Sequence, residues 1–451
     1  MQDGYTHANW IYVDEILKNI ESWDFTSSYP YILVSHQFPS TEFQKCMIKD
    51  RKQMLSRFAY ILVVEFKNIK CKYYNNFISQ SKCREIKKGK YDNGRVIEAE
   101  SLTITLTDVD FYFLLDTYKY DSYEIKESYY SVYDYLPKQF IEFVLEKYVN
   151  KTAYKNVEGM EVEYAKEKNK FNALYGMSVT NMIRDEVLYD NELDWTEREL
   201  ENAEIIEKLN EEKKKAFLSF AYGVWVTAYA RSNLLKNVIQ LDEYVVYCDT
   251  DSMKLKEGYD KTVIEKYNKF VIQKLKHVSK LLDIPYEKFS PKDSKGERHI
   301  LGVFDNDGQY EEFITQGAKK YAYTKWVDIE KIKDKDGKIK KDVNVQEVKG
   351  NKAKILEITV AGVPKTGALG LKNLSEFKDN FIFDFKYTNK NLLMYCENQE
   401  KCTIIDYQGN EYTVEDKTGC CIVPTTYILG KALDYADLIS DNSSKRAKYK
   451  E

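Results

Sequence analysis

The chain has 451 residues, enough for two or three domains with a large core. Hydrophobic residues make up 43% and charged residues 31%, a balance typical of a globular protein, and no apolar run is long enough to span a bilayer. The eight cysteines include no Cys-x-x-Cys pair and the four histidines are scattered, which argues against a zinc site and a histidine-based site. A reducing, cytoplasmic setting without a membrane partner is expected.

The distribution of charge is more informative than its sum. The formal net charge of -4 argues weakly against a simple polyanion binder. However, the segment 319–354 contains twelve lysines and only six acidic residues, and the segment 445–450 is also basic. Both segments could contact a polyanion, or they could be an ordinary solvated loop and tail.

The first third of the chain alternates between strand and helix signals. Asp24 is predicted at the end of a strand, just before the apolar residues 31–34. An aspartate there could simply cap a helix whose first turn contains Pro30. Residues 41–60 are predicted to be helical. The next residues, 61–135, should form a small mixed insertion, with a strand at 61–66, a hairpin turn at Asn93-Gly94, a strand at 96–106 and a helix at 108–118.

Two helices are predicted next, at 137–150 and from 159 to about 175. The first has one apolar face, formed by Phe140, Phe143, Val144 and Tyr148. In the second, Lys168, Asn172 and Tyr175 follow an i, i+4, i+7 spacing and therefore share one face. A cation, an amide and an aromatic ring in one stripe could hold a triphosphate and stack on a base. The alternative is a solvated stripe that includes one buried tyrosine.

A long apolar segment leads into two closely spaced carboxylates. Residues 190–215 are highly charged and should form a solvated hairpin or helix, whereas 218–241 is predicted to be a buried helix. A strand at 244–247 then runs into Tyr-Cys-Asp-Thr-Asp-Ser, which predicts strand, tight turn, strand with Asp249 and Asp251 at the turn. Carboxylates held in this way suit hard divalent cations such as Mg²⁺, although Asp and Thr are also ordinary turn residues.

The remaining residues contain mostly strand and turn signals. The predicted elements are an amphipathic helix at 260–283, a turn at Asn306-Asp307-Gly308, a strand up to Trp326, a hairpin closed by Asp336-Gly337 and a strand entering a turn at 358–365. Residues 366–451 are mixed in character and contain no recognisable chemistry.

Four motifs, each weak alone, occur in one order over about 340 residues: Asp-x-x-x-x-Tyr-Pro at 24–30, Lys-x-x-x-Asn-x-x-Tyr-Gly at 168–176, Tyr-x-Asp-Thr-Asp-Ser at 247–252 and Lys-x-Tyr at 319–321. Together they resemble the polymerase domain of the family B DNA polymerases. The form Tyr-Cys-Asp-Thr-Asp-Ser, the helix before it and Ala-Gly-Val-Pro-Lys at 361–365 resemble most the protein-primed branch found in phages and linear plasmids. In that branch two insertions interrupt the palm.

The resemblance implies an α+β fold shaped as a right hand. Its antiparallel palm sheet, helical fingers and C-terminal thumb would follow one another with two insertions between them. The implied ranges are palm at 1–60 and 216–350, first insertion at 61–135, fingers at 136–181, second insertion at 182–215 and thumb at 351–451.

The resemblance also implies a template-directed DNA polymerase that adds dNTPs to a 3'-hydroxyl. Such transfer needs two metal ions about 3.5–4 Å apart, here Mg²⁺, for which Mn²⁺ can substitute. Asp24 and Asp251 are the implied metal ligands, together with the backbone carbonyl of Phe25, and Asp249 would support the turn. Lys168 would contact the triphosphate and offset the charge that develops on it.

Further residues are implied to hold the nucleotide. Asn172 and Tyr175 would form the surface against which the new base pair packs. Tyr29 would lie under the sugar and exclude a 2'-hydroxyl, the group that distinguishes RNA precursors from DNA precursors.

Other implied contacts are with primer–template DNA. Lys319 and Tyr321 would hold it near the primer end through phosphates and minor-groove acceptors, which need no particular sequence. Lys365 would contact the DNA backbone. A terminal protein that serves as primer would dock on the first insertion.

The sequence also departs from the family pattern. Ala173 stands where Ser is usual, and the Tyr-x-Gly-Gly stretch that precedes the palm survives only as Gly4-Tyr5, with Met1 and Asp3 in place of Tyr and Gly. The family's 3'-5' exonuclease domain lies upstream of that stretch, so the exonuclease domain and proofreading are expected to be absent. A separate exonuclease chain, a split product and a protein that works without proofreading all remain open.

Two alternatives remain. The first is a nucleic-acid-primed family B replicase, which would be favoured if 60–135 and 182–215 were mere loops instead of subdomains. The second is a catalytically silent DNA-binding or scaffold subunit of a split polymerase. The intact set of Asp24, Asp249, Asp251 and Lys168 argues against this second alternative.

Overall fold

The computed structural model of the protein shows a mixed α+β fold. It divides into two compact units, the first made of 1–9 and 21–308 and the second of 10–20 and 309–451. Among the described residues, no helix is long and apolar enough to cross a membrane. The structure describes residues 4–179, 183, 186–190, 194–215, 219–334, 336–385, 402–405, 411–414, 425–431, 435 and 438–440.

Several sequence expectations lie outside these residues. Among them are Met1 and Asp3, the basic segment 445–450 and much of the predicted thumb beyond 385.

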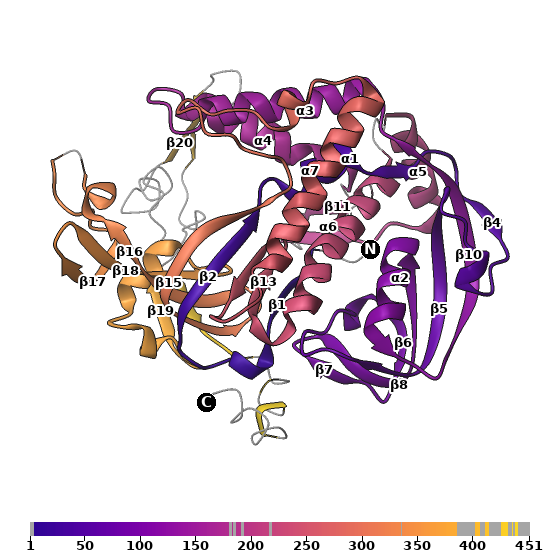
Figure 1. The fold of residues 1–451 in the computed structure, drawn as a ribbon, viewed down its shortest axis with the longest axis horizontal. Coiled ribbons are helices and arrows are strands. Elements are labelled where there is room, and N and C mark those ends of the chain that lie inside the picture. Colours follow the sequence, from indigo (N-terminus) through magenta and orange to yellow (C-terminus); the bar gives the residue numbers. More distant parts are fainter. Residues whose placement is uncertain are drawn as a thin grey trace. The chain divides into compact units, whose positions relative to one another are not determined.

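A four-stranded antiparallel arrangement brings distant segments of the first unit together (Figure 1). Its order is β1 (Thr6–Ala8), β13 (Val245–Asp249), β14 (Ser252–Leu255) and β2 (Leu17–Phe25). The predicted strand, turn and strand around Asp249 and Asp251 are therefore confirmed. The register places Asp24 opposite Ser252.

Two long helices pack with these strands (Figure 1). They are α6 (Phe220–Leu241) and α7 (Thr262–Leu282), close to their predicted bounds. A third, α1 (Ser28–Ser35), follows β2 directly. Its N-cap residue is Ser27, so the expectation that Asp24 could serve as a helix cap is wrong.

Residues 58–135 form most of a second antiparallel sheet with a helix on it. Its main path is β3 (Gln37–Pro39), β10 (Ser122–Tyr135), β5 (Phe58–Cys71), β8 (Arg95–Thr107) and β6 (Cys83–Lys87). The shorter strands β4 (Gln44–Cys46), β7 (Lys90–Asp92) and β9 (Tyr118–Lys119) pair with it, and α2 (Asp108–Thr117) follows β8. The predicted Asn93-Gly94 turn is confirmed: both residues have positive φ, which a tight two-residue hairpin requires.

This second sheet shares a core with the first. One cluster of buried side chains joins Phe66 and Leu102 of the second sheet to Phe25, Leu234 and Met253. Polar contacts cross the same boundary, since Arg231 of α6 pairs with Asp110 of α2 at 2.8 Å. Residues 58–135 therefore form most of a sheet of their own, and a continuous core joins that sheet to the rest of the first unit.

Two predictions of local structure are wrong. Residues 41–60 are not helical: they contain β4, a short 3₁₀ turn at Arg51–Gln53 and the start of β5. Their pairing with β10 outweighs a helix propensity that is only a weak local preference. The expected turn at 306–308 lies inside β15 (Phe304–Gly317) instead. Turn-like features remain within the strand, since Gly308 has a φ of +120° and its N–H donates to Asn306 Oδ1 at 2.9 Å.

Two helices follow the second sheet. They are α3 (Lys138–Tyr154) and α4 (Glu161–Ser178), linked through Gly159 at a φ of +81°. Phe143 was predicted on the apolar face of α3, but it is 42% exposed. A hairpin of β11 (Glu186–Asp190) and β12 (Asp194–Arg198) comes next, followed by α5 (Asn202–Lys215), so 186–215 contains both a hairpin and a helix.

The second unit is built on long antiparallel strands. The order is β15, β16 (Lys320–Asp328), β18 (Lys352–Val360) and β17 (Asn344–Lys349). A 3₁₀ segment, Lys365–Gly370, packs on β18. Two further pairs are β19 (Ile382–Phe385) with β22 (Thr425–Ile428) and β20 (Cys402–Ile405) with β21 (Glu411–Val414).

Candidate active site

Asp24 and Asp251 lie beside each other at the end of β2. The backbone N–H of Phe25 donates to the carbonyl oxygen of Asp251 at 2.8 Å, which ties the β13–β14 turn to β2. Burial, and then the nearby charge of Asp251, raise the pKa of Asp24 to about 7. Because a carboxyl held in this way is costly to ionise, the arrangement calls for a cation.

One oxygen of this pair has no hydrogen-bond partner among the residues that the structure describes. Oδ1 of Asp24 is buried, and no described residue forms a hydrogen bond with it. An unpaired buried oxygen is destabilising unless something else satisfies it. A hard divalent cation with oxygen ligands would do so, and the residues present therefore fit Mg²⁺ or Mn²⁺.

The turn that bears Asp251 is held by Gly4, Tyr5 and Thr6. Thr250 has a φ of +54°, and its N–H donates to the carbonyl of Tyr5 at 2.7 Å. Gly4 lies so close that a Cβ there would be 2.9 Å from Thr250 Cγ2. Asp249 accepts a hydrogen bond from Thr6 Oγ1 at 3.1 Å. Asp249 is therefore anchored to β1, in keeping with a supporting role.

Phe25 can contribute only its backbone to this site. Its ring is 3% exposed and stacks on Phe304, with ring centroids 3.9 Å apart. Packing of the ring in the core fixes the main chain at the end of β2, next to Asp24.

Two charged groups near the carboxylates were not predicted from the sequence. Lys254 lies two residues beyond Ser252 on β14, is 4% exposed and donates to Ser22 Oγ at 2.6 Å. The charges of Asp307, Asp24 and Asp249 all act on its ammonium group. Asp307 was assigned to a turn in the sequence, but it is an exposed residue of β15 whose charge also reaches Asp24. Strand register could have identified Lys254, since residues two apart share a face.

Lys168 of α4 is exposed, and its ammonium lies 6.0 Å from the centre of the Tyr164 ring. A second lysine, Lys151 of α3, donates to Ser27 Oγ at 3.0 Å. Burial first, then the charge of Lys168, lower the pKa of Lys151 to about 8, whereas Asp24 raises it. Lys151 is thus within electrostatic range of both Lys168 and Asp24. The sequence gives no sign of this, since the helix predicted at 137–150 ends one residue before Lys151.

Tyr29 and Tyr175 meet across α1 and α4. Their ring centroids are 4.4 Å apart at an angle of 39°. Asn172 is exposed on α4, one turn before Tyr175. The structure therefore brings the first motif and the second motif into contact in the first unit.

The predicted DNA-binding residues belong to the second unit. Lys319 is exposed in the tight β15–β16 turn at a φ of +58°, and Tyr321 stacks near Phe313 at 5.4 Å. Lys365 is exposed at the start of its 3₁₀ segment. Hydrogen bonds from Lys325 and Tyr323, and then the charges of Lys325 and Lys365, lower the pKa of Glu357. Lys319 and Tyr321 thus share one hairpin, formed by β15 and β16.

Another group of possible metal ligands occurs at Asp293, Glu297 and His299, whose ligand atoms lie within 4.8 Å of one another. Oδ1 of Asp293 accepts backbone N–H groups of Lys295 and Glu297 at 2.9 Å, and Oδ2 contacts His299 at 3.2 Å. These carboxylate oxygens already organise a loop, unlike Oδ1 of Asp24.

No protein-family model and no curated protein matches the chain. Among solved structures, phi29 DNA polymerase with primer–template DNA matches 95% of the chain at a TM-score of 0.60 and 16% identity. The ternary complex of the same polymerase with incoming nucleotides matches with a TM-score of 0.59. A complex with single-stranded DNA matches 84% of the chain at 18% identity and a TM-score of 0.56. The chain has the fold of these structures, but it spans only 61%, 60% and 56% of their respective lengths.

Proposed function

We propose that the chain is a template-directed DNA polymerase that adds deoxynucleotides to a primer 3'-hydroxyl. The observation that carries the proposal is the position of Asp24, with its unpartnered buried oxygen, beside Asp251. The fold match supports it, since two of the matching structures hold primer–template DNA and one of these also holds incoming nucleotides.

The fold would then be arranged as a right hand. The palm would comprise 1–60 and 216–350, the fingers 136–181 and the thumb 351–451. The insertions would be 61–135 and 182–215.

Two Mg²⁺ ions would be held by Asp24, Asp251 and the backbone carbonyl of Phe25, with Asp249 fixing the turn. When bound, they supply a lowered pKa for the primer hydroxyl and neutralise charge on the triphosphate. The 3'-oxygen forms a bond to the α-phosphorus as the bond to the pyrophosphate oxygen breaks.

The lysines of the helix pair would receive the triphosphate. Lys168 and Lys151 come from α4 and α3 and repel each other, so a polyphosphate near both would relieve the repulsion. Ser27 orients Lys151 through its hydrogen bond. Charge that develops on the leaving pyrophosphate would be stabilised by these ammonium groups.

The contact of Tyr29 with Tyr175 would support the nucleotide. Tyr29 would lie under the sugar and exclude a 2'-hydroxyl, while Tyr175 and Asn172 would face the new base pair. Lys319, Tyr321 and Lys365 would contact primer–template DNA in the second unit.

Primer extension by the purified chain tests the proposal. A labelled primer on a template, dNTPs and Mg²⁺ should give extension that EDTA abolishes. Asp251→Asn and Asp24→Asn should each reduce the rate at least about 10²–10³-fold, the contribution expected of a single electrostatic group at a reacting centre. Glu257→Gln, which removes an exposed acid close to the same hairpin, is the matched control and should retain the rate.

The same variants distinguish a silent scaffold subunit. Binding of labelled primer–template, followed by fluorescence anisotropy, should be nearly unchanged in Asp251→Asn. A folded wild-type chain that binds DNA but never extends it would contradict the proposal and favour the scaffold alternative.

Protein priming is a second, finer candidate. It is favoured by the first insertion, a sheet with its own helix, and by the hairpin and helix at 186–215. In that reaction a protein hydroxyl replaces the primer 3'-hydroxyl. A mixture of the chain, the other replication proteins of its source and a dNTP labelled at the α-phosphate should then transfer label to a protein. Label that appears only in DNA would favour nucleic-acid priming.

A further inference from the structure

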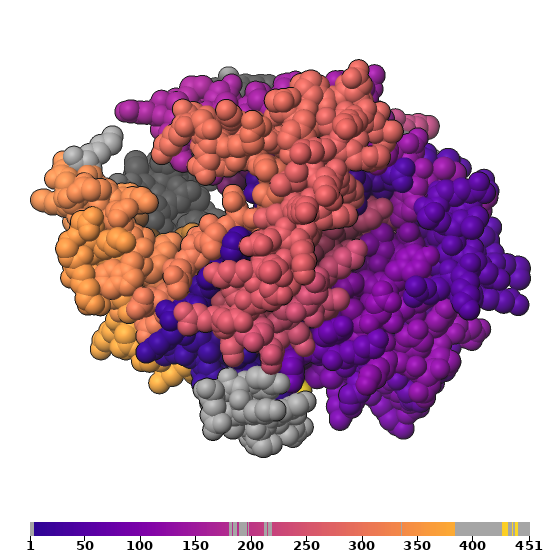
Figure 2. Space-filling view, viewed as in Figure 1, coloured from indigo at the N-terminus to yellow at the C-terminus, as the bar shows by residue number. Residues whose placement is uncertain are grey.

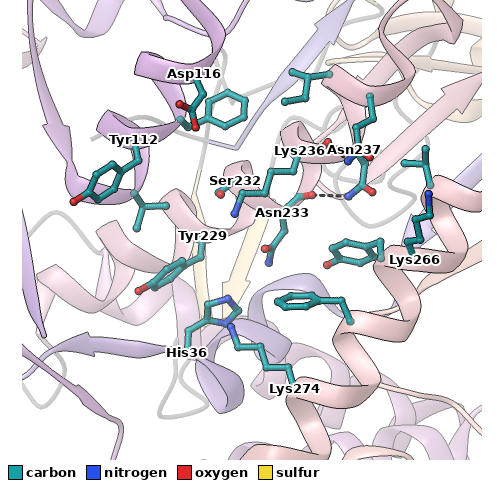
Figure 3. A pocket seen from close by; sticks show the side chains of 17 residues that line it. His36, Tyr112, Asp116, Tyr229, Ser232, Asn233, Lys236, Asn237, Lys266 and Lys274 are labelled. Atoms are coloured by element: carbon teal, nitrogen blue, oxygen red, sulfur yellow. Dashed lines mark hydrogen bonds between the residues drawn. The ribbon is translucent and has the colours of Figure 1, made fainter. Parts of the chain in front are cut away.

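A cavity of about 710 Å³ lies in the first unit, and none of the predicted site residues lines it. We call it the helix cavity. Its walls come from α2, α6 and α7 and from His36 at the end of α1 (Figure 3). On the surface, α7 (salmon) lies beside the purple surface of the 58–135 segment (Figure 2). A volume of this size is typical of sites for small molecules.

Cations dominate the charged groups of the helix cavity. Lys236 of α6 and Lys266 and Lys274 of α7 line it (Figure 3). None of the three forms an ion pair with a described residue. The one acidic lining residue, Asp116, is exposed at the edge and already contacts Arg51 at 3.7 Å. Asp116 also acts on Lys236, but three lysines against one carboxylate leave the described lining with an excess of positive charge.

The lysines also disturb one another. Burial, and then the charge of Lys236, lower the pKa of Lys274 to about 7. Burial and the charges of Lys274 and Lys236 hold the pKa of His36 well below its usual value. Positive groups that repel each other across a cavity cost stability, and an anion placed between them would remove that cost.

The other walls suit a flat ring and its polar edge. The aromatic side chains are those of Tyr112, Phe113, Tyr229, Tyr267 and Phe270. Phe270 is 54% exposed, so it is available at the mouth. Uncharged polar side chains stand beside them on α6, at Ser232, Asn233 and Asn237 (Figure 3) and at Gln240. The amide nitrogens of Asn237 and Gln240 each donate one hydrogen bond to a backbone carbonyl, of Asn233 and Lys236, at 2.8 Å. Rings that stack on a base, amides that read its edge and ammonium groups that hold phosphate are the components of a nucleotide site.

We propose that the helix cavity binds a phosphorylated nucleoside, taken either as a free nucleotide or as a nucleotide of single-stranded DNA. This site is separate from Asp24 and Asp251 and does not depend on the proposed polymerase activity. Phosphate would lie between Lys236 and Lys274, and the base would lie among the aromatic side chains.

Calorimetric titration with dATP in EDTA tests this proposal, since removing divalent metal weakens polyphosphate binding at the carboxylates. The double variant Lys236→Met/Lys274→Met should weaken binding at least about tenfold, because two charge-assisted contacts with phosphate are lost. Lys269→Met, at an exposed α7 lysine outside the cavity, is the control. Methionine keeps the chain length and removes the repulsion, so thermal unfolding should show a double variant at least as stable as wild type.

Four comparisons make the outcome decisive. Deoxyadenosine without phosphate should bind at least about tenfold more weakly, and dAMP against a short single-stranded oligonucleotide separates the two sources of ligand. Lys168→Met should leave binding in EDTA unchanged. Equal affinity of the wild type and the double variant for dATP would overturn the proposal. So would binding that is lost only in Lys168→Met, or pyrophosphate that binds with the same affinity as dATP. Primer extension by the double variant should stay at the wild-type rate.

Discussion

Asp24 has a buried carboxyl group next to a second carboxylate, and this should be visible in the pH dependence of stability. In an unfolded chain Asp24 ionises near pH 4, whereas its pKa in the folded, metal-free chain is about 7. Between these values the folded state keeps a proton that the unfolded state has lost. The free energy of unfolding should therefore fall as pH rises from about 4 to about 7.

Asp24→Asn should remove that loss. In EDTA, urea unfolding should show the variant gaining stability over wild type between pH 5 and pH 8, by about 1–3 kcal/mol at 1.4 kcal/mol per pKa unit. Saturating Mg²⁺ should reverse the order, since the metal stabilises only wild type strongly. A difference between the two proteins that does not change with pH would mean that Asp24 is not forced to keep a proton.

Lys254 is a positive group built into the carboxylate cluster. It is nearly inaccessible and hydrogen-bonded to Ser22, and the charges of Asp24, Asp249 and Asp307 act on its ammonium group. A fixed ammonium there balances part of the negative charge without a metal, and it also repels any cation that arrives.

Lys254→Met should therefore tighten binding of divalent metal, by about tenfold if the repulsion lost is near 1.4 kcal/mol. It should also lower the stability of the metal-free chain. Mn²⁺ titration followed by electron paramagnetic resonance measures the affinity, and Lys254→Arg, which keeps the charge, is the control. Unchanged Mn²⁺ affinity in Lys254→Met would show that its charge does not reach the metal site.

The helix pair α3 and α4 places two lysines on the approach to the carboxylates. Lys168 belongs to a recognisable motif, whereas Lys151 is visible only because Ser27 and Asp24 lie next to it in space. The i, i+4, i+7 stripe on α4 thus shares one surface with Lys151 of α3 and Tyr29 of α1.

Lys151→Met should raise the KM for dNTPs about tenfold or more, with a smaller effect on kcat, if Lys151 holds the triphosphate before reaction. Steady-state primer extension over a range of dNTP concentrations measures both constants. Lys155→Met, an exposed lysine four residues further along the chain, should leave KM unchanged. If both variants behave alike, the effect is one of general charge and not of position.

The first unit, although it has two sheets, has a core that joins them. Trp225 of α6 donates to the hydroxyl of Tyr133 at 2.6 Å, and that hydroxyl donates to Asp108 at 2.8 Å. Together with the Arg231–Asp110 pair, these contacts connect the second sheet to the helix that precedes the candidate site. The second sheet is therefore structurally continuous with the candidate site.

Asp110→Asn should destabilise the first unit by about 3–5 kcal/mol, since the buried Arg231 guanidinium loses its partner. Hydrogen exchange should speed up in β5 and in β13 together, because one core supports both. The double variant Asp110→Leu/Arg231→Met, without the unpaired charge, should recover much of the loss. Faster exchange confined to 58–135 would show instead that the insertion unfolds independently.

The sequence alone determined the local elements with strong periodicity or specific turn chemistry. The strand, turn and strand at Asp249 and Asp251, the buried helix before them and the Asn93-Gly94 hairpin all follow from neighbouring residues. Local signals were misleading at 41–60, where pairing with the distant strand β10 decides the structure, and at 306–308, which lies inside β15.

Tertiary structure alone decided how the site is assembled and charged. The cost of the buried oxygen of Asp24 depends on packing and on Asp251, 227 residues away in the chain. Lys151, Lys254 and the lysines of the helix cavity have no sequence motif, since their significance lies in what surrounds each ammonium group. Burial and long-range electrostatics depend on the arrangement of the whole fold, and for that reason a pattern of neighbouring residues could not reveal them.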